Sequence, residues 1–272
     1  MDRTLFSPAM IETYRACPKA YEMAFIKPRG EADKLKLSTV TKRLLLRAFT
    51  DVNRGRTKTV AEAQRFIGQQ WSALKIEADA PENVHSQSIR AFRFAYRALN
   101  AYVSKPYRPA GSEVVGANIK LRARIAHSRA YIEDVFDLLL WHPQDQTLEI
   151  VDYQLSNIKP FDPAWPSPST LIKHFLAERM QARYPFKKIR LTYAQILASG
   201  VNYQSIELDE AVFRLHWPML KDTIEEMKSA AALPAQPSDL CRRCEFSSAC
   251  PAAKQHELLT CEDRRNVVYR SA

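Results

Sequence analysis

No uninterrupted apolar run in this 272-residue sequence approaches the roughly 20 residues that a membrane-spanning helix needs. The first residues, Met1 to Thr4, lack the charged-then-apolar order of a secretory signal. The sequence also has no internal repeat and no low-complexity segment. We therefore expect a globular protein of the cytoplasm that has no membrane partner.

Cysteine is scarce, with five residues, and three of them fall within ten positions near the C-terminus. In a cytosolic chain we do not expect a disulfide framework, so the spacing matters more than the number. Cys241, Cys244 and Cys250 form a Cys-x2-Cys-x5-Cys array that needs a fourth ligand. Cys17 is the leading candidate and Cys261 is the competitor. Spacing leaves zinc and an iron-sulfur centre both open, and incidental thiols are the remaining alternative.

Positive charge exceeds negative charge by +10, and the isoelectric point is near 9.4. This excess favours a polyanionic partner such as DNA or RNA. Arg90, Arg93 and Arg97 are interleaved with aromatic residues in a predicted helix over about 84–104. Such a segment can bind a nucleic-acid backbone and stack bases. Because the aromatic spacing is close to 3.6, however, core packing is the more frequent role of these aromatics.

The order of the predicted elements indicates a mixed α/β fold in a single domain, 1–272. A mainly helical part, 1–110, precedes a sheet core with an inserted helix, 111–208. A C-terminal helix and the cysteine segment occupy 209–272. Helices are predicted from Ser7 to about Phe25 and over 34–54, 60–76, 84–104, 170–184 and 209–232, and strands over 114–125, 130–140, 148–154, 188–197 and 202–208.

Two predicted strands carry aspartates. Asp134 lies on the strand over 130–140, and Asp152 lies near the end of the strand over 148–154. Leu148, Ile150, Asp152 and Gln154 share one face of that strand, because side chains alternate along it. An antiparallel pairing of the two strands would bring Asp134 near Asp152. Paired carboxylates suit Mg²⁺ or Mn²⁺ and an activated water, and ordinary strand-edge carboxylates are the alternative.

The segment from Ser7 to Pro18 reads Ser-x-x-x-Ile-x-x-Tyr-x-x-Cys-Pro. Together with the two aspartate strands and the cysteine triplet, it resembles the RecB-type branch of the PD-(D/E)XK nuclease superfamily over nearly the whole chain. The likeness is to iron-sulfur members, such as AddB-type helicase-nuclease domains and the exonucleases of CRISPR adaptation. It implies a restriction-endonuclease-like mixed sheet flanked by helices, with an N-terminal helical region and a C-terminal cysteine cluster.

The resemblance also implies site residues. A 4Fe-4S cluster would be bound by the first cysteine and the last three, which are Cys17, Cys241, Cys244 and Cys250. Cys261 is then spare. Asp134 and Asp152 would hold the catalytic metal, with Gln154 beside them.

The third motif of that family usually runs Asp-Tyr-Lys, and this chain has Gln154 where the lysine belongs. Glutamine can hydrogen-bond to water but cannot offset charge on a phosphate. The histidine expected in the second helix has no counterpart between Ser38 and Leu46, where Lys42 or Arg43 stands nearby. Asn118 stands where the family often has a glutamate on the first strand, and Tyr131 stands where it has a glycine before Asp134. The helix after the proline-rich loop has no convincing Gln-x-x-x-Tyr motif.

Lys173 or His174, on the helix over 170–184, could compensate if one of them reaches the site. Two functional hypotheses then follow. The first is an iron-sulfur DNA nuclease of the exonuclease type, acting on single strands or ends in repair, recombination or defence. The second is a nuclease-fold protein that binds DNA or a partner such as a helicase without cleaving. A zinc-stabilised RNA-binding module is a third class, which leaves the two aspartates unexplained.

Overall fold

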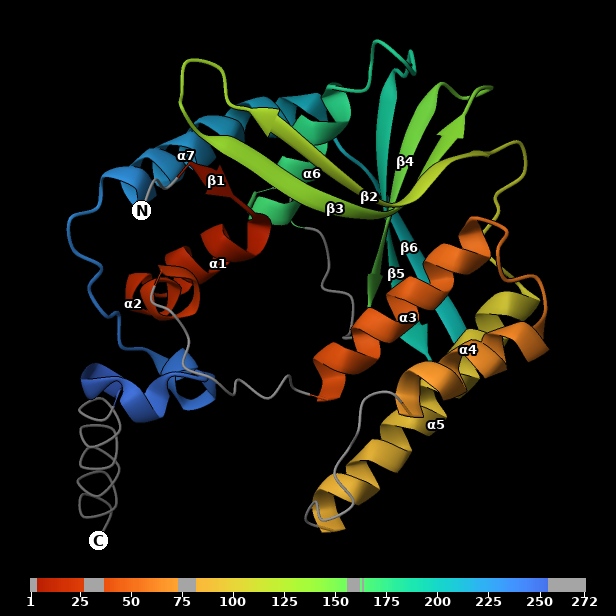
Figure 1. Cartoon of the computed structure of the whole chain (residues 1–272). Helices are drawn as coiled ribbons and strands as arrows, with labels where there is room; N and C mark the ends of the chain where they lie inside the picture. Colours follow the sequence, from red (N-terminus) through yellow and green to blue (C-terminus); the bar gives the residue numbers. More distant parts are fainter. Residues whose placement is uncertain (1–3, 27–36, 73–81, 156–161, 163, 254–272) are drawn as a thin grey trace, which may run out of the picture. The chain divides into compact units, whose positions relative to one another are not determined.

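The computed structural model describes residues 4–26, 37–72, 82–155, 162 and 164–253 (Figure 1). The chain divides into two compact units. The first consists of 1–33, 125–131 and 218–272, and the second of 34–124 and 132–217. Among the helices in the described ranges, none has the length and apolar character to cross a membrane.

The second unit is built on a mixed β-sheet whose strands follow the order β2-β3-β4-β5-β6. Strand β3 pairs antiparallel with β4, β4 pairs parallel with β5, and β5 pairs antiparallel with β6. The strands are β2 (Glu113–Arg124), β3 (Tyr131–His142), β4 (Thr147–Gln154), β5 (Lys188–Leu197) and β6 (Gly200–Glu207). The predicted mixed α/β class with a sheet flanked by helices is confirmed.

Helices α3 (Leu37–Asn53), α4 (Val60–Ser72) and α5 (Glu82–Ser104) lie together on one side of this sheet (Figure 1). Their apolar side chains form one buried core with the sheet, to which β4 contributes Val151 and Tyr153. Alternation along the strand therefore directs Asp152 to the opposite face. Helix α6 (Pro168–Glu178) packs against β2 and β5.

Local sequence explains where α6 begins. Ser167 is its N-cap, because the Ser167 side chain accepts a hydrogen bond from the Thr170 N–H (3.1 Å). Pro168 occupies the first helical position, where a missing N–H costs nothing. The helix ends at Glu178, six residues before the predicted end, and the chain continues to Tyr184 in turns.

The first unit contains the short strand β1 (Leu5–Phe6), helices α1 (Pro8–Ala16) and α2 (Pro18–Tyr21), and the π-helical turn η1 (Glu22–Ile26). It also contains the part of α7 (Glu210–Ser229) from Pro218 onward and the 3-10 turns η2 (Asp239–Arg243) and η3 (Ser247–Ala249). The predicted N-cap Ser7 is confirmed, since its hydroxyl accepts from Met10 N–H at 3.4 Å.

The prediction of one continuous helix from Ser7 to about Phe25 is wrong. Cys17 has extended backbone angles (φ −167°, ψ 112°) and separates α1 from α2. The cause is Pro18, because a proline ring disfavours the helical conformation of the residue before it. Cys17 closes α1 through its N–H, which donates to the Thr13 carbonyl oxygen (2.9 Å), and its own carbonyl oxygen accepts the Tyr21 N–H (3.1 Å). Tyr14, on α1, donates to Glu226 of α7 at 2.7 Å and anchors this segment inside the unit.

Candidate active site and cysteine pocket

The β3–β4 ladder ends where the carboxylates begin. Its register runs from His142 opposite Thr147 to Leu138 opposite Val151. Continuing it by one pair would set Asp137 opposite Asp152. At this position a side chain replaces the backbone partner, because Asp137 Oδ2 accepts a hydrogen bond from the Tyr153 N–H at 2.8 Å. The backbone pairing of the two strands therefore ends at the carboxylates.

A lysine from α6 reaches this point. Lys173 Nζ lies 2.6 Å from Asp134 Oδ2, and the Lys173 side chain is only 5% exposed. Burial lowers the pKa of Lys173, but the negative charges of Asp152, Asp134 and Asp137 outweigh it and raise the pKa above its ordinary value. Lys173 is therefore a buried, permanently protonated cation among three carboxylates.

Asp137 has the most perturbed carboxyl group of the cluster. Burial and the neighbouring charge of Asp152 raise the pKa of Asp137 to about 7. The hydrogen bond from Tyr153 N–H, Lys173 and Lys42 act in the opposite direction. The side chain can therefore take up or release a proton near neutral pH, as a general acid or base must. Lys42 of α3 thus contributes charge to the site from the region where a histidine was expected.

The structure brings the predicted Asp134 and Asp152 into one electrostatic cluster through Lys173. The sequence prediction missed Asp137, which continues the ladder opposite Asp152. One signal could have found it, because Asp137 directly precedes the apolar run Leu138-Leu139-Leu140 on the same strand. A charged residue next to such a run at the open end of a ladder is unusual for packing alone.

Gln154 lies two residues beyond Asp152, opposite Gln195 of β5, and is half-buried. Its predicted role beside the metal stays a prediction. Of the two residues named as compensating candidates, Lys173 contacts the cluster. His174 instead stacks on Phe213 with ring centroids 4.3 Å apart. Burial lowers the pKa of His174 to about 4, so this side chain is neutral and belongs to the packing of α6.

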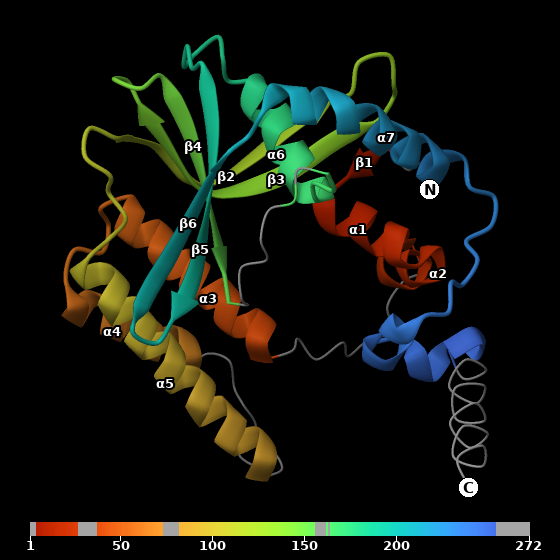
Figure 2. The same ribbon diagram turned by 180° about the vertical axis from the view of Figure 1, so that it is seen from behind.

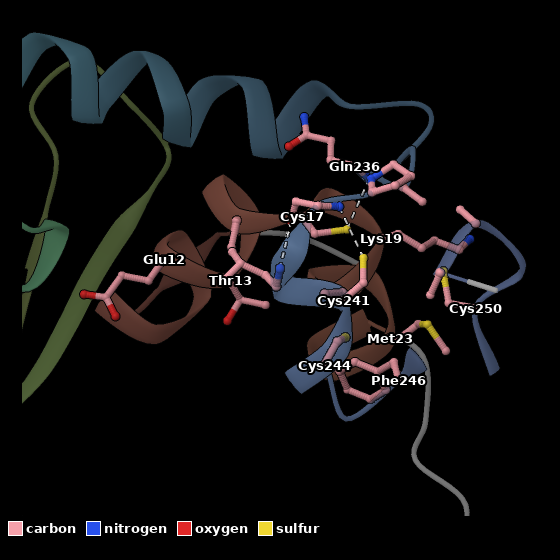
Figure 3. A pocket seen from close by; sticks show the side chains of 18 residues that line it. Glu12, Thr13, Cys17, Lys19, Met23, Gln236, Cys241, Cys244, Phe246 and Cys250 are labelled. Atoms are coloured by element: carbon pink, nitrogen blue, oxygen red, sulfur yellow. Dashed lines mark hydrogen bonds between the residues drawn. The ribbon is translucent and has the colours of Figure 1, made fainter. Parts of the chain in front are cut away.

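The second candidate site is a cavity of about 330 Å³ within the first unit, and Cys17, Cys241, Cys244 and Cys250 all line it (Figure 3). Each of the four cysteines is half-buried. Cys17 lies at the break between α1 and α2, and Cys241 lies in the η2 turn. The sulfur atoms of these two residues point toward one another in Figure 3. Cys261, the competing fourth ligand, lies outside the described residues.

Backbone N–H groups point at two of these sulfur atoms. Gln236 N–H donates to Cys17 Sγ and Ser238 N–H donates to Cys241 Sγ, each at 3.4 Å. Hydrogen bonds of this kind stabilise thiolates and tune metal clusters, so the cavity fits a cysteine-bound cluster. Across the described ranges, no group of three or more His, Cys, Asp or Glu side chains, at the cysteines or at the carboxylates, is arranged as a metal-ion site. The four cysteines are grouped around a cavity and not around a point.

The three predicted nucleic-acid-binding arginines, Arg90, Arg93 and Arg97, are exposed on one face of α5. The aromatics between them, Phe92, Phe94 and Tyr96, are partly buried against the helix core. Core packing is therefore the role of these aromatics, while the arginines remain available to a ligand.

Comparison with known proteins agrees with this architecture. The family model for the PD-(D/E)XK nuclease superfamily matches residues 5–251. A crystal structure from Eubacterium rectale, provisionally named an exonuclease, superposes with a TM-score of 0.52 at 12% identity, covering 89% of this chain and 88% of that one. The structure of SSO0001 covers 79% of this chain and 96% of its own at 15% identity, but its TM-score of 0.32 is too low to support an argument. No curated protein matches the sequence.

The family match spans both candidate sites, since it begins before Cys17 and ends after Cys250. It includes the strands and the helix that carry the carboxylates and Lys173. At 12% identity the solved neighbour supports the fold alone. On the strength of the family match, the chain belongs to the PD-(D/E)XK nuclease superfamily.

Proposed function

We propose that the protein is a metal-dependent DNA nuclease of the exonuclease type. The observation that carries the proposal is the gathering of Asp134, Asp137, Asp152 and Lys173 where the backbone pairing of β3 and β4 ends. Three carboxylates around a buried lysine are costly to keep inside a protein unless they have a chemical task. The name of the Eubacterium rectale neighbour is consistent with the exonuclease type.

In this proposal Asp134 and Asp152 hold Mg²⁺ or Mn²⁺, which supplies Lewis-acid activation of a phosphodiester and of water. Lys173, which lies beside these carboxylates, would provide the positive charge that Gln154 lacks. Gln154 orients the attacking water by hydrogen bonding. Asp137, with a pKa of about 7, accepts the proton that this water loses.

The cysteine pocket carries a second part of the proposal. Cys17, Cys241, Cys244 and Cys250 bind a 4Fe-4S cluster, in keeping with the RecB-type branch, and zinc is the alternative. Support comes from the shared cavity and from the two N–H groups directed at Cys17 and Cys241. The cluster has a structural role, because it joins the α1–α2 break to the η2 and η3 turns.

A DNA-binding protein without cleavage is the second candidate function. It is favoured by the ion pair between Lys173 and Asp134, because this pair already neutralises a carboxylate that the metal would need. DNA, as single strands or ends, is the partner in both cases, and a helicase or another DNA-processing protein is a further proposed partner. DNA repair, recombination or defence is the proposed setting.

The test is a cleavage assay on end-labelled single- and double-stranded DNA with Mg²⁺ or Mn²⁺, comparing the parent protein with Asp152→Ala. The proposal predicts metal-dependent release of nucleotides from an end by the parent and none by the variant. DNA binding without cleavage by either protein would support the second candidate. Cleavage that survives in Asp152→Ala would place the chemistry elsewhere.

A further inference from the structure

A pocket of about 840 Å³ lies in the second unit, between the C-terminal end of α5 and the β5–β6 hairpin, which lie side by side in both views (Figure 2). Its wall includes Lys105, Arg108, Tyr107, Asn202 and Tyr203. None of the described residues that line it is acidic, and none belongs to the carboxylate cluster. The pocket is therefore a separate, positively charged cavity within the size range of small-molecule sites.

The two cations of the pocket differ in how they are held. Arg108 donates from Nη2 to the carbonyl oxygen of Asn53 at 2.7 Å, which fixes the guanidinium at the wall. Lys105 follows directly after the end of α5 and is exposed. A fixed arginine and an exposed lysine on an acid-free wall attract an anion of the size of a phosphate.

An aromatic surface lies beside these charges. The rings of Tyr107 and Tyr203 stack with centroids 4.2 Å apart and an interplanar angle of 24°. Tyr107 OH donates to the buried Glu149 at 2.8 Å, which fixes its ring. The Tyr203 hydroxyl oxygen is buried and has no hydrogen-bond partner among the described residues. A planar ligand in the pocket can stack on the accessible ring surface of this pair.

The exposed basic face of α5 extends to this pocket. Arg90, Arg93 and Arg97 are exposed and follow a spacing of three or four residues. One turn further along this stripe lies Ala101, which lines the pocket. A polyanionic strand that follows the arginines along α5 therefore arrives at the pocket.

We propose that this pocket binds one nucleotide, with its phosphate at Lys105 and Arg108 and its base against the Tyr107–Tyr203 pair. The nucleotide is either a free nucleoside monophosphate or one unit of a DNA strand that follows the α5 stripe. Neither source requires hydrolysis at the carboxylate cluster, so the inference does not depend on the proposed nuclease activity.

The test is calorimetric titration of the full-length protein with deoxyadenosine 5′-monophosphate in EDTA, which keeps metal out of the carboxylate cluster. Lys105→Gln should weaken binding about fivefold, the effect of losing one charged contact. The matched control is Lys187→Gln, another exposed lysine of the second unit that does not line the pocket, and it should leave affinity unchanged. Deoxyadenosine or inorganic phosphate alone should bind more weakly than the nucleotide.

Tyr203→Leu and Tyr203→Phe separate stacking from folding. Tyr203→Phe keeps the aromatic ring and should leave nucleotide affinity unchanged, whereas Tyr203→Leu removes the ring that stacks on Tyr107 and should weaken binding. An affinity that is insensitive to both Lys105→Gln and Tyr203→Leu would overturn the proposal. So would an affinity that falls in Lys173→Gln but not in Lys105→Gln, since the nucleotide would then occupy the carboxylate cluster.

A 5′-phosphorylated oligodeoxyadenylate identifies the source of the nucleotide. If a DNA strand occupies the pocket, Lys105→Gln weakens oligonucleotide and mononucleotide binding by the same factor. If only the free mononucleotide occupies it, the oligonucleotide affinity is unchanged by Lys105→Gln and the mononucleotide affinity still falls. No measurable mononucleotide binding at millimolar concentration would contradict the proposal in both forms.

Discussion

The carboxylate cluster and the cysteine pocket are built in opposite ways. Around the carboxylates the protein supplies its own counter-charge through the Lys173–Asp134 ion pair, and Tyr153 N–H satisfies Asp137. A paired sheet and α6 hold these groups in place. The cysteines lie on a helix break and on short 3-10 turns, and their described polar contacts are N–H groups directed at Cys17 and Cys241.

From this difference we propose that the carboxylate cluster is preformed without a metal, whereas the cysteine pocket is stabilised by the group that it binds. Loss of metal from the carboxylates should change activity and leave stability almost unaltered. Loss of the proposed cluster from the cysteines should lower the free energy of unfolding, because Cys241, Cys244 and Cys250 lie in or directly after short 3-10 turns. The predictions below test that contrast, beginning with the largest expected effect.

The largest effect is expected from Cys250→Ala. The proposed cluster would lose a ligand, and the free energy of unfolding of the first unit should fall by several kcal/mol, on the order seen for structural metals. Protein purified without oxygen should be brown, with the broad visible absorbance of iron-sulfur centres, and the variant should be bleached.

Cys261→Ala is the matched control and should retain both colour and stability, because Cys261 is the cysteine left spare. A colourless parent that contains stoichiometric zinc would contradict the iron-sulfur assignment. A Cys250→Ala variant as stable as the parent would show that the two regions do not differ as proposed.

A smaller effect concerns Asp137 and pH. Its pKa in the folded protein is about 7, above the ordinary value of 3.8, so the folded state binds more protons than the unfolded state between pH 4 and 7. The free energy of unfolding of the metal-free protein should therefore fall as pH rises through this window, by at most about 1.4 kcal/mol per pH unit, and this contribution should level off above pH 7.

Urea denaturation of the parent and Asp137→Asn at several pH values measures this contribution. The variant keeps an oxygen to accept Tyr153 N–H but cannot titrate, so its stability relative to the parent should rise between pH 4 and 7. The charge of Asp152 helps to raise the pKa of Asp137. Asp152→Asn should therefore lower that pKa and narrow the pH range over which the stability of the protein changes. Parallel stability curves for the parent and Asp137→Asn would refute the pKa assignment.

The smallest effect is expected on the outer face of α5. DNA affinity should fall linearly with salt on a double-logarithmic plot, as counterions are released. The slope of this plot reports the number of phosphate contacts. Reversing charge with Arg90→Glu and Arg93→Glu should make the slope shallower, as expected for the loss of roughly 2 contacts. The folding of α5 should not change, because both arginines are exposed. Fluorescence anisotropy with labelled DNA provides the measurement, and an affinity that does not depend on salt would rule out this interface.

Much of the sheet could be predicted from the sequence. Strands predicted over 148–154 and 188–197 correspond to β4 (Thr147–Gln154) and β5 (Lys188–Leu197), because buried strands have strong alternating or continuous apolar patterns. Helix ends were harder to place. Nothing in the sequence pattern indicated that turns replace the end of the predicted helix over 170–184, whereas the break at Cys17 has a sequence signal in Pro18 that the spacing of apolar residues outweighed.

The candidate site was predictable only in part. Asp152 could be placed because it follows an apolar run. Asp137 carries a local signal in the apolar run after it, but its position opposite Asp152 depends on the register between β3 and β4. Lys173 lies on a helix whose packing against the sheet positions its side chain. The lysine is 19 residues beyond Gln154 in the chain, so spacing within the Asp-Tyr-Gln segment could not indicate it.

The central claim is that Lys173 supplies, from α6, the positive charge that Gln154 lacks on β4. It is tested most directly by the rate of Mn²⁺-dependent DNA cleavage in four proteins: the parent, Gln154→Lys, Lys173→Gln and the double variant. The account predicts that Gln154→Lys keeps or raises the rate. Lys173→Gln should lower the rate about 10²- to 10³-fold, the effect of one preorganised donor, and the double variant should recover much of that loss. A Lys173→Gln variant as active as the parent, or a parent that binds DNA but never cleaves it, would contradict the account.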